Sequence, residues 1–72
     1  MDETPLEVAQ RHVAEAEARV AVQTTRVKDL AHRGLDTGQA QALLVLFEQT
    51  LRFMREDLVE EQERAAGSSL PT

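Results

Sequence analysis

The stretch HRGLDTGQ, residues 32–39, decides the fold of this chain. It is the only place between Pro5 and Gly67 where residues that interrupt a helix gather. Gly34 can adopt the left-handed backbone conformation that ends a helix, and Leu35 supplies the apolar contact that commonly follows such a glycine. The stretch therefore predicts that one helix ends here.

A second helix is predicted to begin within the same stretch. Asp36 is its expected N-cap, with Gln39 three residues later as the capping-box partner, and Thr37 is a competing cap. A connection this short forces the two helices to lie antiparallel and adjacent. The sequence thus predicts an all-α fold, an antiparallel two-helix hairpin.

The first helix has its own start signal in TPLE, residues 4–7. Thr4 is the expected N-cap, Pro5 occupies the first helical position, and Glu7 completes a capping box. Gly67 is expected to end the second helix. The predicted organisation is a cap segment 1–4, a hairpin over 5–66 (helix 5–33, turn 34–36, helix 37–66) and a disordered tail 67–72.

Apolar residues recur at alternating spacings of three and four along both predicted helices. The seam of the first helix is Leu6, Ala9, Val13, Ala16, Val20, Gln23, Val27 and Leu30, and that of the second is Ala40, Leu44, Phe47, Leu51, Met54 and Leu58. This heptad spacing is typical of helices that pack along a line. The expected hairpin core consists of Val13, Val20, Val27, Leu44, Phe47, Leu51 and Met54.

Gln23 is the one polar residue in the seam of the first helix. A buried polar residue at such a position often sets the register of two helices at some cost in stability. We therefore expect Gln23 to pair with a polar group on another helix, for which Thr50 is the candidate. The alternative interpretation is that Gln23 points partly to solvent.

The second helix carries more apolar surface than one seam can cover. Leu43, Leu46 and Phe53 lie beside the seam, and Val8 and Val22 form a weaker flank on the first helix. The resulting stripe is about 160° wide. Each such side chain that stays in water lacks about 1.5–3 kcal/mol of the stabilisation that burial would give it. These five residues are therefore the expected interface of a homodimeric four-helix bundle.

Composition points in the same direction and excludes other classes. The 72 residues include no cysteine, so a chain this small lacks a disulfide staple and is expected to gain stability from a partner chain. Only 8 basic residues stand against 13 acidic ones, which disfavours nucleic acid as a partner. No apolar run approaches the length of a membrane span, and the acidic N-terminus does not resemble a signal peptide, so a cytoplasmic location is expected.

Charge is distributed unevenly along the predicted hairpin. Near the turn, Arg26, Lys28 and Arg33 outnumber the acids, whereas acidic residues gather at the open end, including the run 56–63. A head-to-tail dimer would bring each basic turn near an acidic end, although exposed ion pairs contribute only about 0–1 kcal/mol each. The acidic run has two interpretations, a solvated helix end or a surface for a basic partner.

No catalytic constellation is present, so we expect neither an enzyme nor a cofactor. One metal hypothesis stays open, because His12 and Glu15 lie three apart on one helix face with Glu17 close by. Metal sites in helical bundles use such inward-pointing residues, although in the order Glu-x-x-His. The alternative, which the spacing favours, is that His12 is structural or solvated.

Residues 12–23, HVAEAEARVAVQ, and residues 34–56, GLDTGQAQALLVLFEQTLRFMRE, resemble a group of short, uncharacterised helical-hairpin proteins of alphaproteobacteria. Their pattern is H-[VI]-A-E-x-E-x-x-[VI]-x-x-Q, followed by G-x-D-T-x-x-A and then by an apolar run with F-E or a similar pair. The matching positions are His12, Val13, Ala14, Glu15, Glu17, Val20 and Gln23, and then Gly34, Asp36, Thr37, Ala40, Leu43, Leu44, Phe47 and Glu48. The resemblance implies a bacterial origin and a helical hairpin, and it implies no activity.

Two positions depart from the pattern of that group. Ala16 stands where glycine is usual, and Leu35 stands where histidine is common, which weakens a metal site at the turn. The function expected overall is a non-catalytic helical interaction or regulatory module that self-associates and presents a helix surface to a protein partner. The alternatives are a bundle metal protein using the three residues named above, and an obligate subunit of a hetero-complex.

Overall fold

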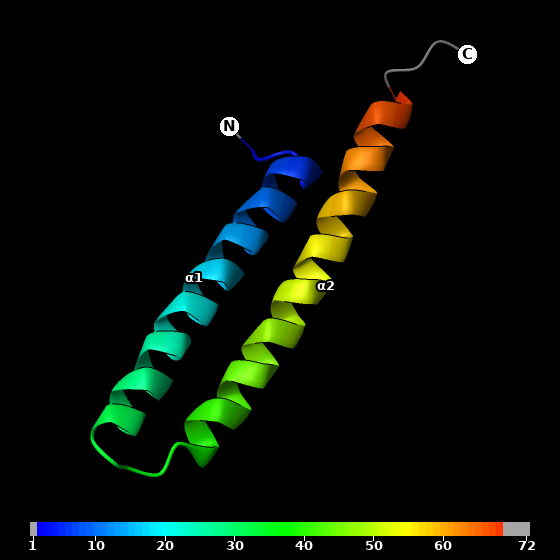
Figure 1. The fold of residues 1–72 in the computed structure, drawn as a ribbon. Helices are drawn as coiled ribbons and strands as arrows, with labels where there is room; N and C mark the ends of the chain where they lie inside the picture. Colours follow the sequence, from blue (N-terminus) through cyan, green and yellow to red (C-terminus); the bar gives the residue numbers. More distant parts are fainter. Residues whose placement is uncertain (1, 69–72) are drawn as a thin grey trace.

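The chain forms two long helices in a computed structural model that describes residues 2–68. Helix α1 spans Pro5–His32 and helix α2 spans Gly38–Ser68. They lie antiparallel, with the connection at one end of the rod and the start of α1 and end of α2 at the other (Figure 1). The rod measures 61 × 23 × 13 Å. The predicted all-α hairpin is confirmed.

The start of α1 is the predicted capping box. The Glu7 backbone N–H donates to Thr4 Oγ1 at 3.1 Å, and the Thr4 backbone N–H donates to Glu7 Oε1 at 3.1 Å. The two bonds satisfy N–H groups that have no partner within a helix. Because the Thr4 backbone N–H and hydroxyl stabilise the charged carboxylate, they lower the pKa of Glu7 below its ordinary value.

The end of α1 follows the expected glycine chemistry. Gly34 has a positive φ of 70°. The helix ends at His32, one residue before the predicted Arg33, which is the C-cap. The Leu35 N–H donates to the Leu30 carbonyl at 3.0 Å, and the Gly34 N–H donates to the Ala31 carbonyl at 3.0 Å. This pair of bonds is the Schellman motif, which gives partners to the last carbonyls of the helix.

The start of α2 differs from the predicted arrangement. Thr37, and not Asp36, directly precedes the helix, and its carbonyl accepts the first helical bond from the Gln41 N–H at 2.8 Å. Asp36 acts one position earlier, because its Oδ1 accepts from the Gly38 N–H at 2.9 Å. An aspartate side chain that bonds two residues ahead makes an Asx turn. Asp36 therefore satisfies an orphan N–H of α2 without occupying the N-cap.

The end of α2 also differs, because the helix passes through Gly67 and continues to Ser68. A single glycine costs a helix only about 1 kcal/mol, and it ends one only where the backbone turns to positive φ. Gly67 does not do so. Of the predicted disordered tail, residues 69–72 lie outside the described part of the chain.

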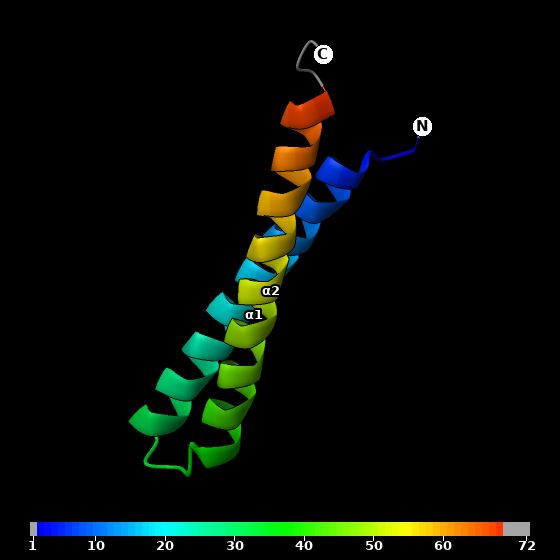
Figure 2. The same cartoon turned by 90° about the vertical axis from the view of Figure 1, so that its right-hand side faces the viewer.

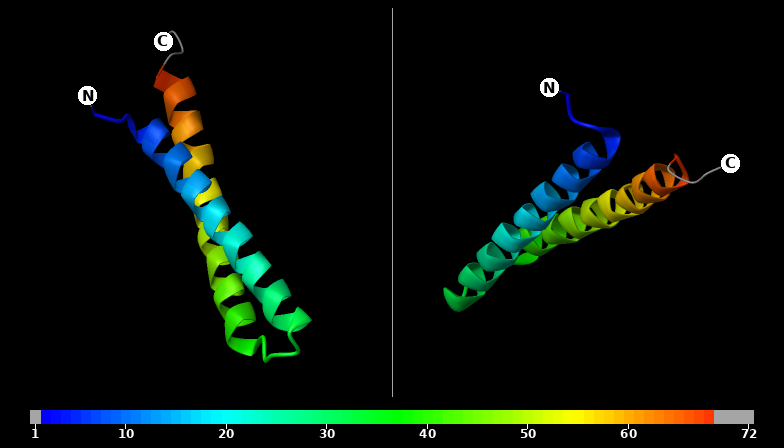
Figure 3. Two further views of the ribbon diagram at one scale, coloured as in Figure 1. Left: turned by 90° about the vertical axis from the view of Figure 1, so that its left-hand side faces the viewer. Right: turned by 90° about the horizontal axis from the view of Figure 1, so that it is seen from above.

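The two helices cross at a shallow angle (Figures 2 and 3). Their contact follows the predicted seams: Ala9, Val13, Ala16, Gln23, Ala40 and Leu51 are buried, and Leu6, Val20, Val27, Leu30, Leu44, Phe47, Met54 and Leu58 are half-buried. The centre is the cluster Val13, Ala16 and Leu51. Three of the buried seam residues are alanines, so the core is thin.

Replacing Gly34 by alanine should destabilise the hairpin by about 1–2 kcal/mol, because an L-residue at positive φ is strained. A Cβ there would meet nothing within 4 Å, so the whole effect is conformational. Gly67→Ala is the matched control: its site is equally open but helical, and alanine should leave stability unchanged or raise it slightly. Urea denaturation followed by circular dichroism measures both. Equal stability of Gly34→Ala and the unmodified chain would contradict the left-handed backbone conformation of Gly34.

Acidification should loosen the start of α1. A carboxyl group whose pKa is lowered by folding stabilises the folded state fully above the unfolded pKa. That stabilisation is lost as pH falls through the lower, folded pKa. NMR titration of the Glu7 carboxyl should give a midpoint below the ordinary glutamate value, with the Thr4 amide shift following it. Glu7→Gln, which does not titrate, should abolish the pH dependence of that amide; a midpoint at or above the ordinary value would rule the capping bond out.

Candidate interaction surface

Large apolar side chains stand exposed on one flank of α2. Leu43 is 40% exposed, Leu46 57% and Phe53 67%. Leu46 and Phe53 are seven residues apart and line up along the helix, and Leu43 lies nearer the seam. We call these three residues the α2 flank. They are the predicted interface residues of this helix, and α1 does not cover them.

The predicted interface residues of α1 contribute unequally. Val22 is 70% exposed, whereas Val8 is half-buried. Polar residues of α1 border the α2 flank more closely. One shallow groove between the helices is lined by Gln23, Arg26, Leu30, Asp36, Gln39, Ala40 and Leu43, and a second by His12, Glu15, Ala16, Arg19, Thr50 and Met54. The flank is therefore apolar along α2 and mixed in charge along its border, where Arg26 lies with Asp36 in one groove and Arg19 lies with Glu15 in the other.

Three further apolar residues are exposed that the periodicity did not single out. They are Leu35 in the connection and Val45 and Val59 on α2. Val59 lies about 120° around the helix from Phe53, at about 100° per residue, so it belongs to a different side of α2. The signal was available in the sequence as a pair of valines separated by two heptads. Helix α2 thus exposes apolar groups on more than one side.

The accessible surface of the chain is large for its mass. It measures 5703 Å², whereas a compact monomer of 8.0 kDa is expected to expose roughly 4,500 Å². The difference arises because two long helices contact each other along one side only. The hairpin therefore holds much more surface in water than a compact fold of equal size.

Gln23 is buried, as the register interpretation requires, but its partner is not the predicted one. Its Nε2 donates to the backbone carbonyl of Ala40 at 2.9 Å. Thr50 lies further along the rod, beside Ala16, and its hydroxyl donates within α2 to the Leu46 carbonyl at 3.1 Å. The Gln23 bond therefore ties α1 to the first turn of α2.

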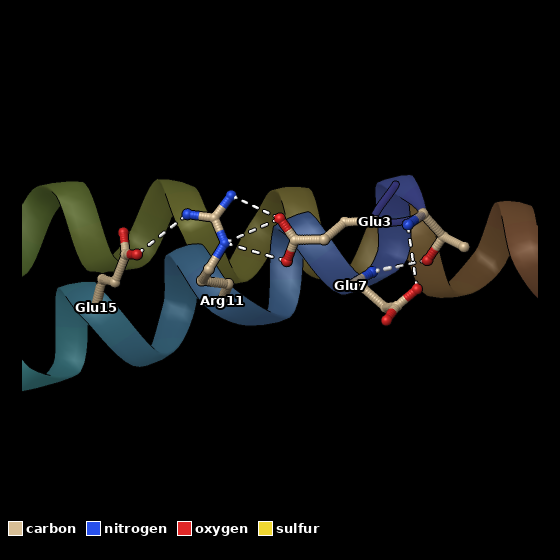
Figure 4. A network of polar contacts seen from close by, with 5 residues as sticks. Glu3, Glu7, Arg11 and Glu15 are labelled. Carbon is tan, nitrogen blue, oxygen red and sulfur yellow. Dashed lines mark hydrogen bonds and ion pairs between the residues drawn. The ribbon is translucent and has the colours of Figure 1, made fainter. Parts of the chain in front are cut away.

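Two of the three candidate metal ligands, Glu15 and Glu17, form ion pairs with arginines. Arg11 bonds Glu15 and Glu3, each at 3.1 Å (Figure 4), and Glu17 approaches Arg55 of α2 at 3.9 Å. The Glu3 and Glu15 carboxylates raise the pKa of Arg11. His12 is half-buried beside Glu15 in the second groove. Across residues 2–68, no three side chains of His, Asp or Glu converge on a point that could hold a metal ion.

Neither helix, within the described residues, carries an apolar segment that could cross a bilayer. Comparison with protein-family models, with curated proteins and with solved structures finds no match for the chain. The resemblance to alphaproteobacterial proteins, the bacterial origin and the cytoplasmic location therefore stay predictions. The role of this surface is therefore inferred from its own geometry.

Replacing Gln23 by glutamate should destabilise the hairpin at pH 7. The change removes the amide donor and places a charged carboxylate against the Ala40 carbonyl, at a cost of about 1–3 kcal/mol or more. Stability should recover as acid protonates the carboxyl. Gln10→Glu, on the exposed side of α1, adds the same charge without burial and should have little effect. Chemical denaturation at pH 7 and pH 4 compares the stability of the two variants. Equal losses of stability would show that the Gln23 hydrogen bond does not stabilise the hairpin.

Proposed function

We propose that this chain is a small, non-catalytic interaction module whose α2 flank binds a second copy, giving a homodimeric four-helix bundle. The observation that supports this is the exposure of Leu43, Leu46 and Phe53 along one side of a helix. Contiguous apolar surface of this kind marks protein contact sites. In a four-helix bundle, the helices of the second copy would bury the flank by the same kind of helix packing that forms the seam of the hairpin.

Energetics favour a partner on this flank. Full burial of a large apolar side chain stabilises by about 1.5–3 kcal/mol. Small domains have a net stability of only about 5–15 kcal/mol, so the three flank residues represent a sizeable share of it. The single-hairpin core is thin, with Val13, Ala16 and Leu51 at its centre. A second chain therefore adds core where the hairpin has little.

We further propose that the dimer presents a surface to another protein, and an apolar residue of α2 outside the flank supports this. Val59 points away from the α2 flank, so a partner on the flank leaves it exposed. Charged residues surround it in the sequence, at Asp57, Glu60 and Glu61. A protein that binds there is expected to present a basic rim around an apolar contact.

Light scattering after size-exclusion chromatography tests the self-association. The unmodified chain should have a mass near twice 8.0 kDa, and Phe53→Glu should weaken the dimer at least tenfold, because it places a charge in the centre of the contact. Val59→Glu is the matched control, since it makes an equally polar change on another side of the same helix. It should leave the dimer intact.

Two outcomes would contradict the proposal in different ways. A mass of 8.0 kDa at high concentration would favour a subunit of a hetero-complex, in which another protein covers the flank. A Phe53→Glu chain as dimeric as the unmodified one would show that the interface lies elsewhere.

A further inference from the structure

We propose that the two copies pair through α2 in antiparallel fashion, about a two-fold axis between Gln49 and Thr50. Leu46 of each copy then packs on Phe53 of the partner subunit. This inference rests on the proposed self-association and adds its direction, its register and its contact residues.

The first step is a line of four residues on α2. Gln39, Leu46, Phe53 and Glu60 are spaced by seven, so they share one side of the helix. The line is symmetric in character about its midpoint, with apolar residues inside and polar residues outside. In an antiparallel pair centred there, each residue meets the one equally far beyond the midpoint. Leu46 meets the partner's Phe53, and Gln39 meets the partner's Glu60.

The second step is charge, which separates the antiparallel from the parallel pair. The later half of α2 is acidic overall, because Glu56, Asp57, Glu60, Glu61 and Glu63 outnumber Arg55 and Arg64, whereas residues 38–47 carry no charge. A parallel pair would set each acid beside its own copy, and like charges in contact repel. An antiparallel pair sets the acidic half of one copy along the uncharged half of the other.

The third step is the polar border beside the uncharged half. Arg26 of α1 lines the same groove as Gln39 and Leu43, and Asp36 of the connection also lines it. In the antiparallel register, the partner's Glu60 arrives at Gln39, and therefore close to Arg26. The side-chain amide of Gln39 can donate to that carboxylate, and Arg26 supplies the opposite charge. Both ends of the line thus gain a favourable partner.

The area available matches what such a pair requires. Each hairpin exposes 5703 Å², which exceeds the roughly 4,500 Å² of a compact monomer of its mass. A specific interface buries about 800 Å² on each partner. An interface of that typical size on α2 would remove most of the excess surface of each copy.

Single cysteines test the direction, because the chain has none of its own. Gln49→Cys lies next to the axis, so two copies should form a disulfide under mild oxidation. Two Glu60→Cys positions would lie about 30 Å apart along an antiparallel pair, at about 1.5 Å per residue, far beyond disulfide reach. Glu60→Cys alone should therefore not link, whereas a mixture of Gln39→Cys and Glu60→Cys chains should link to each other.

Light scattering on each reduced variant, with circular dichroism, confirms that it is still a helical dimer before oxidation. Efficient linking of Glu60→Cys to itself would establish a parallel pair and overturn this inference, while the proposed self-association would stand. A dimer in which neither Gln49→Cys nor the mixture links would also overturn it, because α2 would not lie at the interface. A monomeric unmodified chain would instead overturn the proposed function on which the inference rests.

Discussion

Two helices packed against each other can bury only the sides on which they touch, and this constraint governs the whole molecule. Within residues 2–67, every buried side chain lies on the seam, as Ala9, Val13 and Leu51 show. No large side chain among residues 2–68 is completely enclosed. The thin apolar core is therefore supplemented by the capped helix ends, by the buried hydrogen bond of the Gln23 side-chain amide and, in the function proposed above, by a second chain. The exposed flank of α2 follows from the same constraint and is no local irregularity.

The connection does more than reverse the chain. The Gly34 motif ends α1, and the Asp36 bond to the Gly38 N–H starts α2. The Gln23 amide reaches across to Ala40 just beyond this turn. Backbone geometry and one side chain thus set the alignment of the two helices close to the point where they join. Residues further along the rod then need only be apolar and of suitable size, which is what the heptad spacing supplies.

Much of the hairpin was predictable because its signals are local. The capping box at Thr4 and Glu7, the left-handed Gly34 and both seams need only neighbouring residues to recognise them. The features that escaped prediction depend on how the helices align. Periodicity defines which side of α1 is buried but not its offset along α2, so Gln23 was matched with Thr50 instead of Ala40. Proximity of His12, Glu15 and Glu17 in sequence likewise did not reveal that arginines hold the two carboxylates.

Alanine at the closest points of the seam makes the hairpin's tolerance to mutation asymmetric. Ala9, Ala16 and Ala40 are buried and have almost no side chain left to lose. Every substitution there except glycine enlarges the side chain, and a larger group would push the helices apart and shift the alignment that the Gln23 bond maintains. Sequence variation in this protein should therefore concentrate on the outward faces of the helices. The buried alanines between the helices set their separation, so larger side chains are not accommodated there.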